Sequence, residues 1–315
     1  MLVTEKEMAP GELKSSNHSA AEYFEYTRAA NPVGSGLIPK VPFGEFPSRL
    51  HETGPTGIVP FDLSRELDTP YPATSPALLA SYVRILPNEC VATAPNASSE
   101  LYYCLKGRGH TLVRGERLEW KTGDFMTLPA LHPAAHHSDE ESVFYWVHDE
   151  PLFAYLGAKP ATARFEPTIF PAERCRAELE KVQVDPEAAK RNRLSILLAN
   201  RRFPHTRTVS QTLWVMYGIL PAGAVQSAHR HQSVALDFIL ECPKGCYSLI
   251  GTEIDENGKI VNPRRQEWRP GAAFVTPPGL WHSHHNESGE PAYLIPIQDA
   301  GLQTYLRSLD IRFTK

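Results

Sequence analysis

The chain has 315 residues, of which 42% are hydrophobic, and this is enough for two domains of ordinary size. The formal net charge is −4 and no extended basic run occurs, so we expect neither nucleic acid nor an anionic membrane as a partner. No stretch is apolar for long enough to span a bilayer, and residues 1–7 lack the apolar core of a signal peptide. These features predict a soluble cytoplasmic protein.

The cysteines are few, odd in number and scattered: Cys90, Cys104, Cys175, Cys242 and Cys246. This distribution predicts free thiols and not a disulfide framework. Cys242 and Cys246 could bind a metal or form a redox pair, but the second half of a zinc site is missing.

Residues 1–60 are rich in Pro, Gly, Ser and Glu. A segment of this polarity cannot form a core of its own, so we expect an irregular arm with one short helix at Ser19–Arg28. The arm would wrap around a domain or a neighbouring subunit, which favours a homo-oligomer.

Residues 61–158 contain short apolar runs separated by turn residues, a pattern typical of β-strands. The predicted strands are Ser81–Leu86, Leu101–Leu105, His110–Val113, Phe125–Leu128 and Val143–Val147. Residues 159–205 follow as a linker, in which helical spacing of charged and apolar residues predicts helices at Ala172–Lys181 and Pro186–Leu198.

Residues 206–315 form a second β domain. Its predicted strands are Thr208–Leu220, a histidine-bearing strand, Val234–Glu241, Tyr247–Gly251, Ala273–Thr276, His282–His285 and Ala292–Ile297. The two domains are related, because residues 117–137 and 265–285 share Arg, Glu, Trp, Gly, Pro and a final His-His pair without a gap. The chain therefore contains an internal duplication.

Three histidines of the second domain predict a metal site. His229 and His231 are separated by one residue, so they lie on the same face of an extended strand. A later strand can bring His282 to them, because Pro277-Pro-Gly279 just before His282 favours a turn that returns the chain to the same place.

The first domain has no equivalent set of ligands. Alignment of Leu86-Pro87 with Leu220-Pro221 places Pro95 opposite His229 and Ala97 opposite His231, and Ala134 stands opposite His282. His132, His136 and His137 are nearby but lack a paired strand, and we interpret them as loop or core histidines. The first domain is thus predicted to be structural.

Three neutral imidazoles leave half of an octahedral ion's positions open and leave its charge at +2. Such a site favours an anionic, chelating ligand. With Fe(II), a substrate that offers two adjacent oxygens and O₂ can meet at the ion. Imidazole also suits Zn, Cu and Ni, so another divalent metal stays an alternative.

The spacing Gly223-(x)5-His-x-His, followed by Gly271-(x)5-Pro-x-Gly-(x)2-His-(x)3-Asn286, resembles the two motifs of the cupin superfamily. The glutamate expected in the first motif falls on Ala235 or Leu236, which narrows the resemblance to three-histidine cupins similar to gentisate and salicylate 1,2-dioxygenases. The resemblance implies an all-β fold of two tandem jelly-roll β-barrels joined by a short helical linker. In those enzymes the metal usually lies in the first barrel, whereas here the ligands are in the second.

The resemblance also implies roles for further residues. His284 would lie beside the metal near substrate and oxygen, and Trp214 would form a wall of the pocket. Asp237 stands where these enzymes have a carboxylate-binding arginine, and Gly218 where they have a glutamine. Both departures predict an altered substrate.

Strand parity predicts that the Asp237 side chain enters the pocket, where a carboxylate needs a partner. That partner would be a substrate hydroxyl or amino group, or a protein cation such as Arg230 or one from elsewhere in the chain. Gly218 would leave room for a bulkier ring substituent.

The best-supported hypothesis is a non-haem Fe(II)-dependent dioxygenase acting on a small hydroxylated aromatic or enolic substrate that chelates through oxygens. One alternative is a cupin that uses its metal as a Lewis acid for cyclisation, isomerisation or decarboxylation. The other is a non-catalytic cupin that binds a small molecule.

Overall fold

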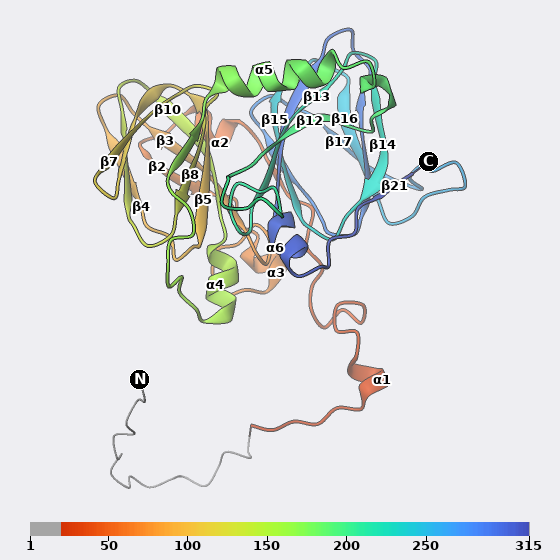
Figure 1. Ribbon diagram of the computed structural model, residues 1–315. Helices are drawn as coiled ribbons and strands as arrows, with labels where there is room; N and C mark the ends of the chain where they lie inside the picture. Colours follow the sequence, from red (N-terminus) through yellow and green to blue (C-terminus); the bar gives the residue numbers. More distant parts are fainter. Residues whose placement is uncertain (1–19, 315) are drawn as a thin grey trace, which may run out of the picture. The chain divides into compact units, whose positions relative to one another are not determined.

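The computed structural model describes residues 20–314 (Figure 1). The chain divides after Pro39 into two compact units. In the first unit, helix α1 spans Tyr26–Ala29, and the Glu25 carboxylate caps it by accepting hydrogen bonds from the backbone N–H groups of Thr27 and Arg28. The predicted helix at Ser19–Arg28 is therefore too long at its start, although Ser19 itself lies outside the described residues.

The second unit contains two β-barrels built to one plan (Figure 1). The first barrel consists of β3 (Leu79–Ile85), β4 (Cys90–Thr93), β5 (Ser99–Lys106), β6 (Arg108–Val113), β7 (Glu116–Lys121), β8 (Phe125–Pro129), β9 (Ala134–Ser138) and β10 (Ser142–His148). The second consists of β13 (Trp214–Leu220), β14 (Val225–Arg230), β15 (Ala235–Glu241), β16 (Cys246–Gly251), β17 (Arg264–Glu267), β18 (Ala273–Thr276), β19 (Trp281–Asn286) and β20 (Ala292–Gln298).

Corresponding strands pair in the same order in both barrels. The first barrel contains the runs β8-β5-β10-β3 and β4-β9-β6-β7, and the second contains β18-β15-β20-β13 and β14-β19-β16-β17. This shared pairing is the arrangement expected of an internal duplication, and the all-β prediction is confirmed. The sequence pattern does not predict the short strands β4, β7, β9 and β17.

Short additional strands extend these sheets: β1 (Glu45–Phe46), β2 (Gly57–Pro60), β11 (Thr168–Phe170), β12 (Leu194–Leu198) and β21 (Arg312–Phe313). The remaining helical segments are α2 (Arg49–Glu52), α3 (Ser64–Leu67), α4 (Glu150–Leu156), α5 (Ala172–Gln183), α6 (Ala300–Tyr305) and a 3₁₀ turn at Ala188–Lys190. Among residues 20–314, no helix has the length and apolar composition that a bilayer crossing requires.

The two barrels pack against each other through an apolar layer. Tyr103 and Tyr145 of the first barrel contact Phe238 of the second, with ring centroids 6.1 and 5.0 Å apart. Leu236 and Phe238 of β15 belong to this layer, whereas Ile239 belongs to the interior of the second barrel. Alternation along β15 therefore points its other side chains into that barrel.

The linker differs from its prediction. The helix expected at Ala172–Lys181 is present as α5, but the one expected at Pro186–Leu198 is wrong beyond the 3₁₀ turn. Its end forms β12, which pairs antiparallel with β13. The alternate residues Leu194, Ile196 and Leu198 pack on the layer between the barrels, so sheet pairing and burial override the helical spacing of the charges.

Candidate metal centre

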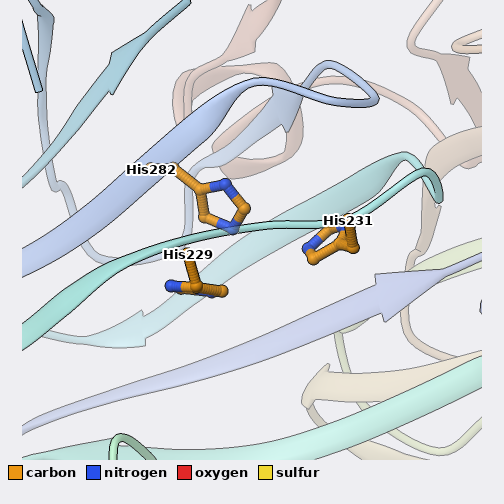
Figure 2. Close-up of side chains that lie close together, drawn as sticks. All are labelled: His229, His231 and His282. Carbon is orange, nitrogen blue, oxygen red and sulfur yellow. The ribbon is translucent and has the colours of Figure 1, made fainter. Parts of the chain in front are cut away.

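The three predicted ligands lie together inside the second barrel (Figure 2). His229 of β14 is directly opposite His282 of β19, and His231 follows just after β14. One ring nitrogen from each histidine lies within 4.8 Å of the others, and all three residues are buried. The turn before β19 is tied to this cluster, because the Gly279 N–H donates to the His231 carbonyl oxygen at 2.7 Å.

The hydrogen bonds of these histidines determine their tautomers. Each Nδ1 lies 2.9 to 3.2 Å from a backbone carbonyl oxygen two residues away, in the pairs His229 with Ser227, His231 with Ser233, and His282 with Leu280. A carbonyl oxygen can only accept, so each Nδ1 carries the hydrogen and each Nε2 presents a lone pair. Three convergent lone pairs fit a divalent metal ion.

The three imidazoles are held neutral. Burial lowers the pKa of His231 to about 4 and lowers the pKa values of His229 and His282 well below the ordinary histidine range. Neighbouring positive charge and the other imidazoles act in the same direction. Metal binding requires the neutral form, so no proton has to be displaced near neutral pH.

Two glutamines that sequence reasoning missed lie beside the three histidines. Gln226 Nε2 is 3.5 Å from His229 Nε2, and Gln298 Nε2 is 3.5 Å from His231 Nε2. The Ser233 hydroxyl donates to Gln298 Oε1 at 2.9 Å and fixes the orientation of that amide. The sequence gives only a weak indication of them: Gln298 ends strand β20, and Gln226 comes three residues before His229.

His284 is held by a short relay that leaves one ring nitrogen free. The Trp268 indole N–H donates to Ser248 Oγ at 2.8 Å, and Ser248 Oγ lies 2.7 Å from His284 Nδ1. Ser248 Oγ accepts from Trp268, and His284 Nδ1 is the acceptor within reach of its own hydrogen among the described residues. We therefore place the hydrogen of His284 on Nε2. Within residues 20–314 that Nε2 is buried without a partner.

The ring centroid of His284 lies 5.9 Å from that of His229 and 5.8 Å from that of His282. His284 is not a member of the three-nitrogen cluster. Its position therefore suits a hydrogen-bond donor next to the cluster better than a fourth ligand.

The first barrel fills the equivalent space with its own side chains. Trp120, Thr111 and His136 repeat the relay, with contacts of 3.0 and 2.8 Å. Here, however, the imidazole Nε2 has a partner, the Thr93 hydroxyl at 3.1 Å, and Thr93 in turn contacts the Tyr102 hydroxyl at 2.8 Å. His136 is thus a core histidine in a complete hydrogen-bond chain.

The strand registers correct the alignment of the two copies. Ala134 is opposite Thr93 in the first barrel, and His282 is opposite His229 in the second. Thr93, and not Pro95, therefore stands in the place of His229. The second copy has one extra residue in the turn before β14 and another in a bulge between Gln226 and His229. An alignment without gaps misses both extra residues and is therefore two positions out at His229.

Asp237 lies inside the second barrel, as strand parity predicts, and is 2% exposed. The Thr276 hydroxyl donates to its carboxylate at 2.8 Å. Burial raises the pKa of Asp237 to about 6, and the nearby Arg193 charge opposes this shift. Arg230 is not its cation, because that guanidinium lies over the Trp281 ring, 5.1 Å from the centroid.

Arg193 is the functional candidate that sequence reasoning missed. It immediately precedes β12, and its Nε–H donates to Gln226 Oε1 at 3.2 Å. Its charge lowers the pKa of four histidines in the second barrel, in the same direction as the larger effect of burial: His229, His231, His282 and His284. Among the described residues, no carboxylate lies within ion-pair distance of it.

The pocket predictions for Trp214 and Gly218 have different outcomes. Trp214 is opposite Gln298, and its indole N–H is buried without a partner in the described part of the chain, so it can donate to a ligand. Gly218 is opposite Ser195 of β12, and a Cβ atom at Gly218 would lie 2.3 Å from Ser195 Oγ. The space expected for a ring substituent is therefore taken up by Ser195.

Comparison with known proteins shows which sequences this chain resembles. No family model matches the chain. It is 34% identical to 5-nitrosalicylic acid 1,2-dioxygenase from Bradyrhizobium sp over 86 residues, which cover 27% of this chain and 42% of that protein. It is 26% identical to gentisate 1,2 dioxygenase 1 from Aquipseudomonas alcaligenes over 104 residues, 33% of this chain and 26% of that protein. The chain spans less than half the length of either curated relative.

Similar solved structures cover nearly the whole chain. Salicylate 1,2-dioxygenase from Pseudaminobacter salicylatoxidans superimposes with a TM-score of 0.68 at 15% identity, over 88% of this chain and 90% of that one. This chain has the fold of that dioxygenase. A variant of the same enzyme in complex with gentisate gives a TM-score of 0.67, covering 91% and 92% of the two chains at 15% identity. The resemblance inferred from the two histidine motifs is confirmed for the fold.

Proposed function

We propose that the chain is a non-haem Fe(II)-dependent dioxygenase that acts on a small, oxygen-chelating aromatic or enolic compound. The observation that carries the proposal is the cluster of three Nε2 lone pairs inside a barrel, each fixed by a backbone carbonyl on the other ring nitrogen. His229, His231 and His282 hold the ion. When bound, iron(II) would supply the redox chemistry that joins O₂ to a substrate chelated through two oxygens.

The protein groups around the ion bind and orient the substrate. His284 offers an Nε2–H and Trp214 an indole N–H, and both are buried donors without partners among residues 20–314. A buried donor gains most from a charged or partly charged oxygen. His284 would donate to an oxygen of the substrate or of O₂, and Trp214 would form the pocket wall.

The charges of the cavity favour an anionic substrate. Arg193 is a cation without a carboxylate partner in the described chain, and it lies in electrostatic reach of the histidine cluster. Asp237 already accepts a hydrogen bond from Thr276, so it does not require a donor from the substrate. We therefore assign the carboxylate or phenolate of a hydroxylated aromatic acid to the Arg193 guanidinium, whose charge also acts on the nearby Asp237 carboxylate.

Relatives support this class of substrate. The substrates in their names are 5-nitrosalicylic acid, gentisate and salicylate, which are all hydroxylated aromatic acids. The decisive experiment is oxygen uptake by protein purified without air and loaded with Fe(II), with each of these three acids as substrate. We expect one of them, or a close analogue, to consume O₂ in proportion to ring opening. Turnover without O₂ uptake would instead indicate Lewis-acid chemistry, and binding without turnover a non-catalytic cupin.

We also propose a homo-oligomer. Residues 20–39 expose Tyr23, Phe24, Tyr26 and Leu37, which are between 74% and 93% accessible to solvent. Several exposed large apolar side chains in one short segment are typical of a segment that binds another chain. Light scattering of the full chain should give a multiple of 35.2 kDa, and removal of residues 1–39 should lower the number of chains per particle.

A further inference from the structure

The strand that carries the metal ligand His229 has a second partner, β21, on its outer edge (Figure 1). In this ladder Phe313 is directly opposite His229, and Arg312 is opposite Arg230. Residues directly opposite each other in an antiparallel pair point to the same face of the sheet. The Phe313 side chain therefore lies on the same face of the sheet as the His229 imidazole.

The ring of Phe313 stacks on that of His229. Their centroids are 5.9 Å apart and the ring planes differ by 19°. Phe313 itself is 55% exposed. The Phe313 ring thus lies against the imidazole on the β21 side of β14, opposite the β19 side that carries His282.

The same segment satisfies the backbone at the bulge. The β14–β19 ladder shifts between Gln226 and His229, which removes the regular ladder partner of the residues in between. The Thr314 N–H and hydroxyl both donate to the Ala228 carbonyl oxygen, each at 3.0 Å. The backbone immediately before His229 is thus held by residues from β21 and its flank.

The segment also reaches the second ligand of the same strand. The Asp310 N–H donates to Gln232 Oε1 at 2.7 Å, and Gln232 follows His231 directly. Residues 310–314 therefore run alongside residues 228–232, the stretch that supplies two of the three ligands.

The first barrel provides an internal comparison. Its equivalent strand β4 pairs with β9 through a regular register without a bulge. In the described residues β4 is the edge strand of its sheet, whereas β14 has β21 as a further neighbour in its sheet. The bulge, the additional strand and the histidine ligands thus occur together in one copy of the duplicated barrel and are absent together from the other.

We propose that residues 310–314 act as a strap that positions His229 for metal binding, with Phe313 as the positioning residue. The strap holds the bulged backbone through Ala228 and holds the imidazole through Phe313. Nε2 then stays directed at His231 and His282. This inference rests on the proposed metal site but not on the proposed reaction.

The test measures metal retention and does not depend on turnover. Full-length protein is loaded with Co²⁺, and the loss of Co²⁺ to excess chelator is followed by its visible absorption. We expect Phe313→Ala and Thr314→Pro to lose the ion about tenfold faster than wild type, because residues that orient a metal ligand typically change affinity by that order. Phe313→Tyr keeps the ring and should restore the wild-type rate.

Tyr305→Ala is the matched control, since Tyr305 is a 66% exposed aromatic residue outside the strap. It should release Co²⁺ at the wild-type rate, and thermal unfolding should be unchanged in the Phe313 variants. The inference is overturned if the strap variants keep the wild-type rate, or if Tyr305→Ala accelerates release equally. If wild type binds no Co²⁺ at one ion per chain, the metal site itself is wrong and the inference fails with it.

Discussion

His284 and His136 occupy equivalent places in the two barrels, yet only His136 has both ring nitrogens paired. The Thr93 hydroxyl lies 3.1 Å from His136 Nε2, whereas His284 Nε2 is buried without a partner among residues 20–314. The relay through Trp and Ser or Thr is the same in both copies. The relay is thus a property of the shared fold, and the free Nε2–H is specific to the barrel with the histidine cluster.

We predict that His284→Ala keeps the metal and loses turnover by about a hundredfold, the typical contribution of a positioned donor or acid–base group. Metal content and kcat are measured on the same preparation. Ser248→Ala removes the group that fixes the tautomer but leaves the imidazole, so an intermediate rate is expected. Full activity of His284→Ala on the true substrate would rule out a catalytic role.

Arg193 should determine the binding of anionic substrates. We expect Arg193→Gln to lower kcat/KM for a hydroxylated aromatic acid by about ten- to a hundredfold, mainly through KM, because one charged hydrogen bond is lost. Arg191→Gln is the control, since Arg191 pairs with Asp185 on the surface at 2.5 Å. Equal kinetics of the two variants would remove Arg193 from the binding site.

The first barrel should give the protein a pH-dependent stability. Burial raises the pKa of Glu100 to about 7, against the hydrogen bonds that it accepts from Tyr102 and Trp146. Because the folded-state pKa is above the unfolded value, the carboxylate is harder to ionise in the folded protein. Stability is therefore lost as the pH rises from about 4.5 to about 7, by on the order of 3 kcal/mol in total.

In Glu100→Gln this part of the pH dependence should disappear, as measured by urea unfolding at several pH values. Glu116→Gln, which changes an exposed carboxylate in the same barrel, should unfold with the wild-type pH profile. Asp237, whose pKa burial raises to about 6, adds a smaller fall at lower pH. A Glu100→Gln profile that falls as far as the wild-type profile up to pH 7 would show that Glu100 is not responsible.

The parts of the site that depend on local pattern could be predicted from the sequence. His229 and His231 share a face because of strand periodicity, and the turn before His282 is encoded by its own residues. The repeated segment likewise predicted two barrels of one design. Asp237 could be placed inside the barrel because no bulge interrupts β15 before it.

The parts of the site that depend on long-range strand pairing could not be predicted from the sequence. Arg193 enters the site because β12 pairs with β13, and the charge spacing of its segment had predicted a helix. Ser195 fills the space beside Gly218 for the same reason. The contact of Phe313 with His229 joins residues far apart in the sequence, and no local pattern indicates it.

We expect His229, His231 and His282 to bind one metal ion per chain in the second barrel. The decisive measurement is metal analysis of protein purified without oxygen, for wild type and for His282→Ala. We predict one equivalent of a divalent ion in the wild type and almost none in the variant, which should remain folded. An unchanged metal content in His282→Ala, or stoichiometric metal bound in the first barrel, would contradict the account.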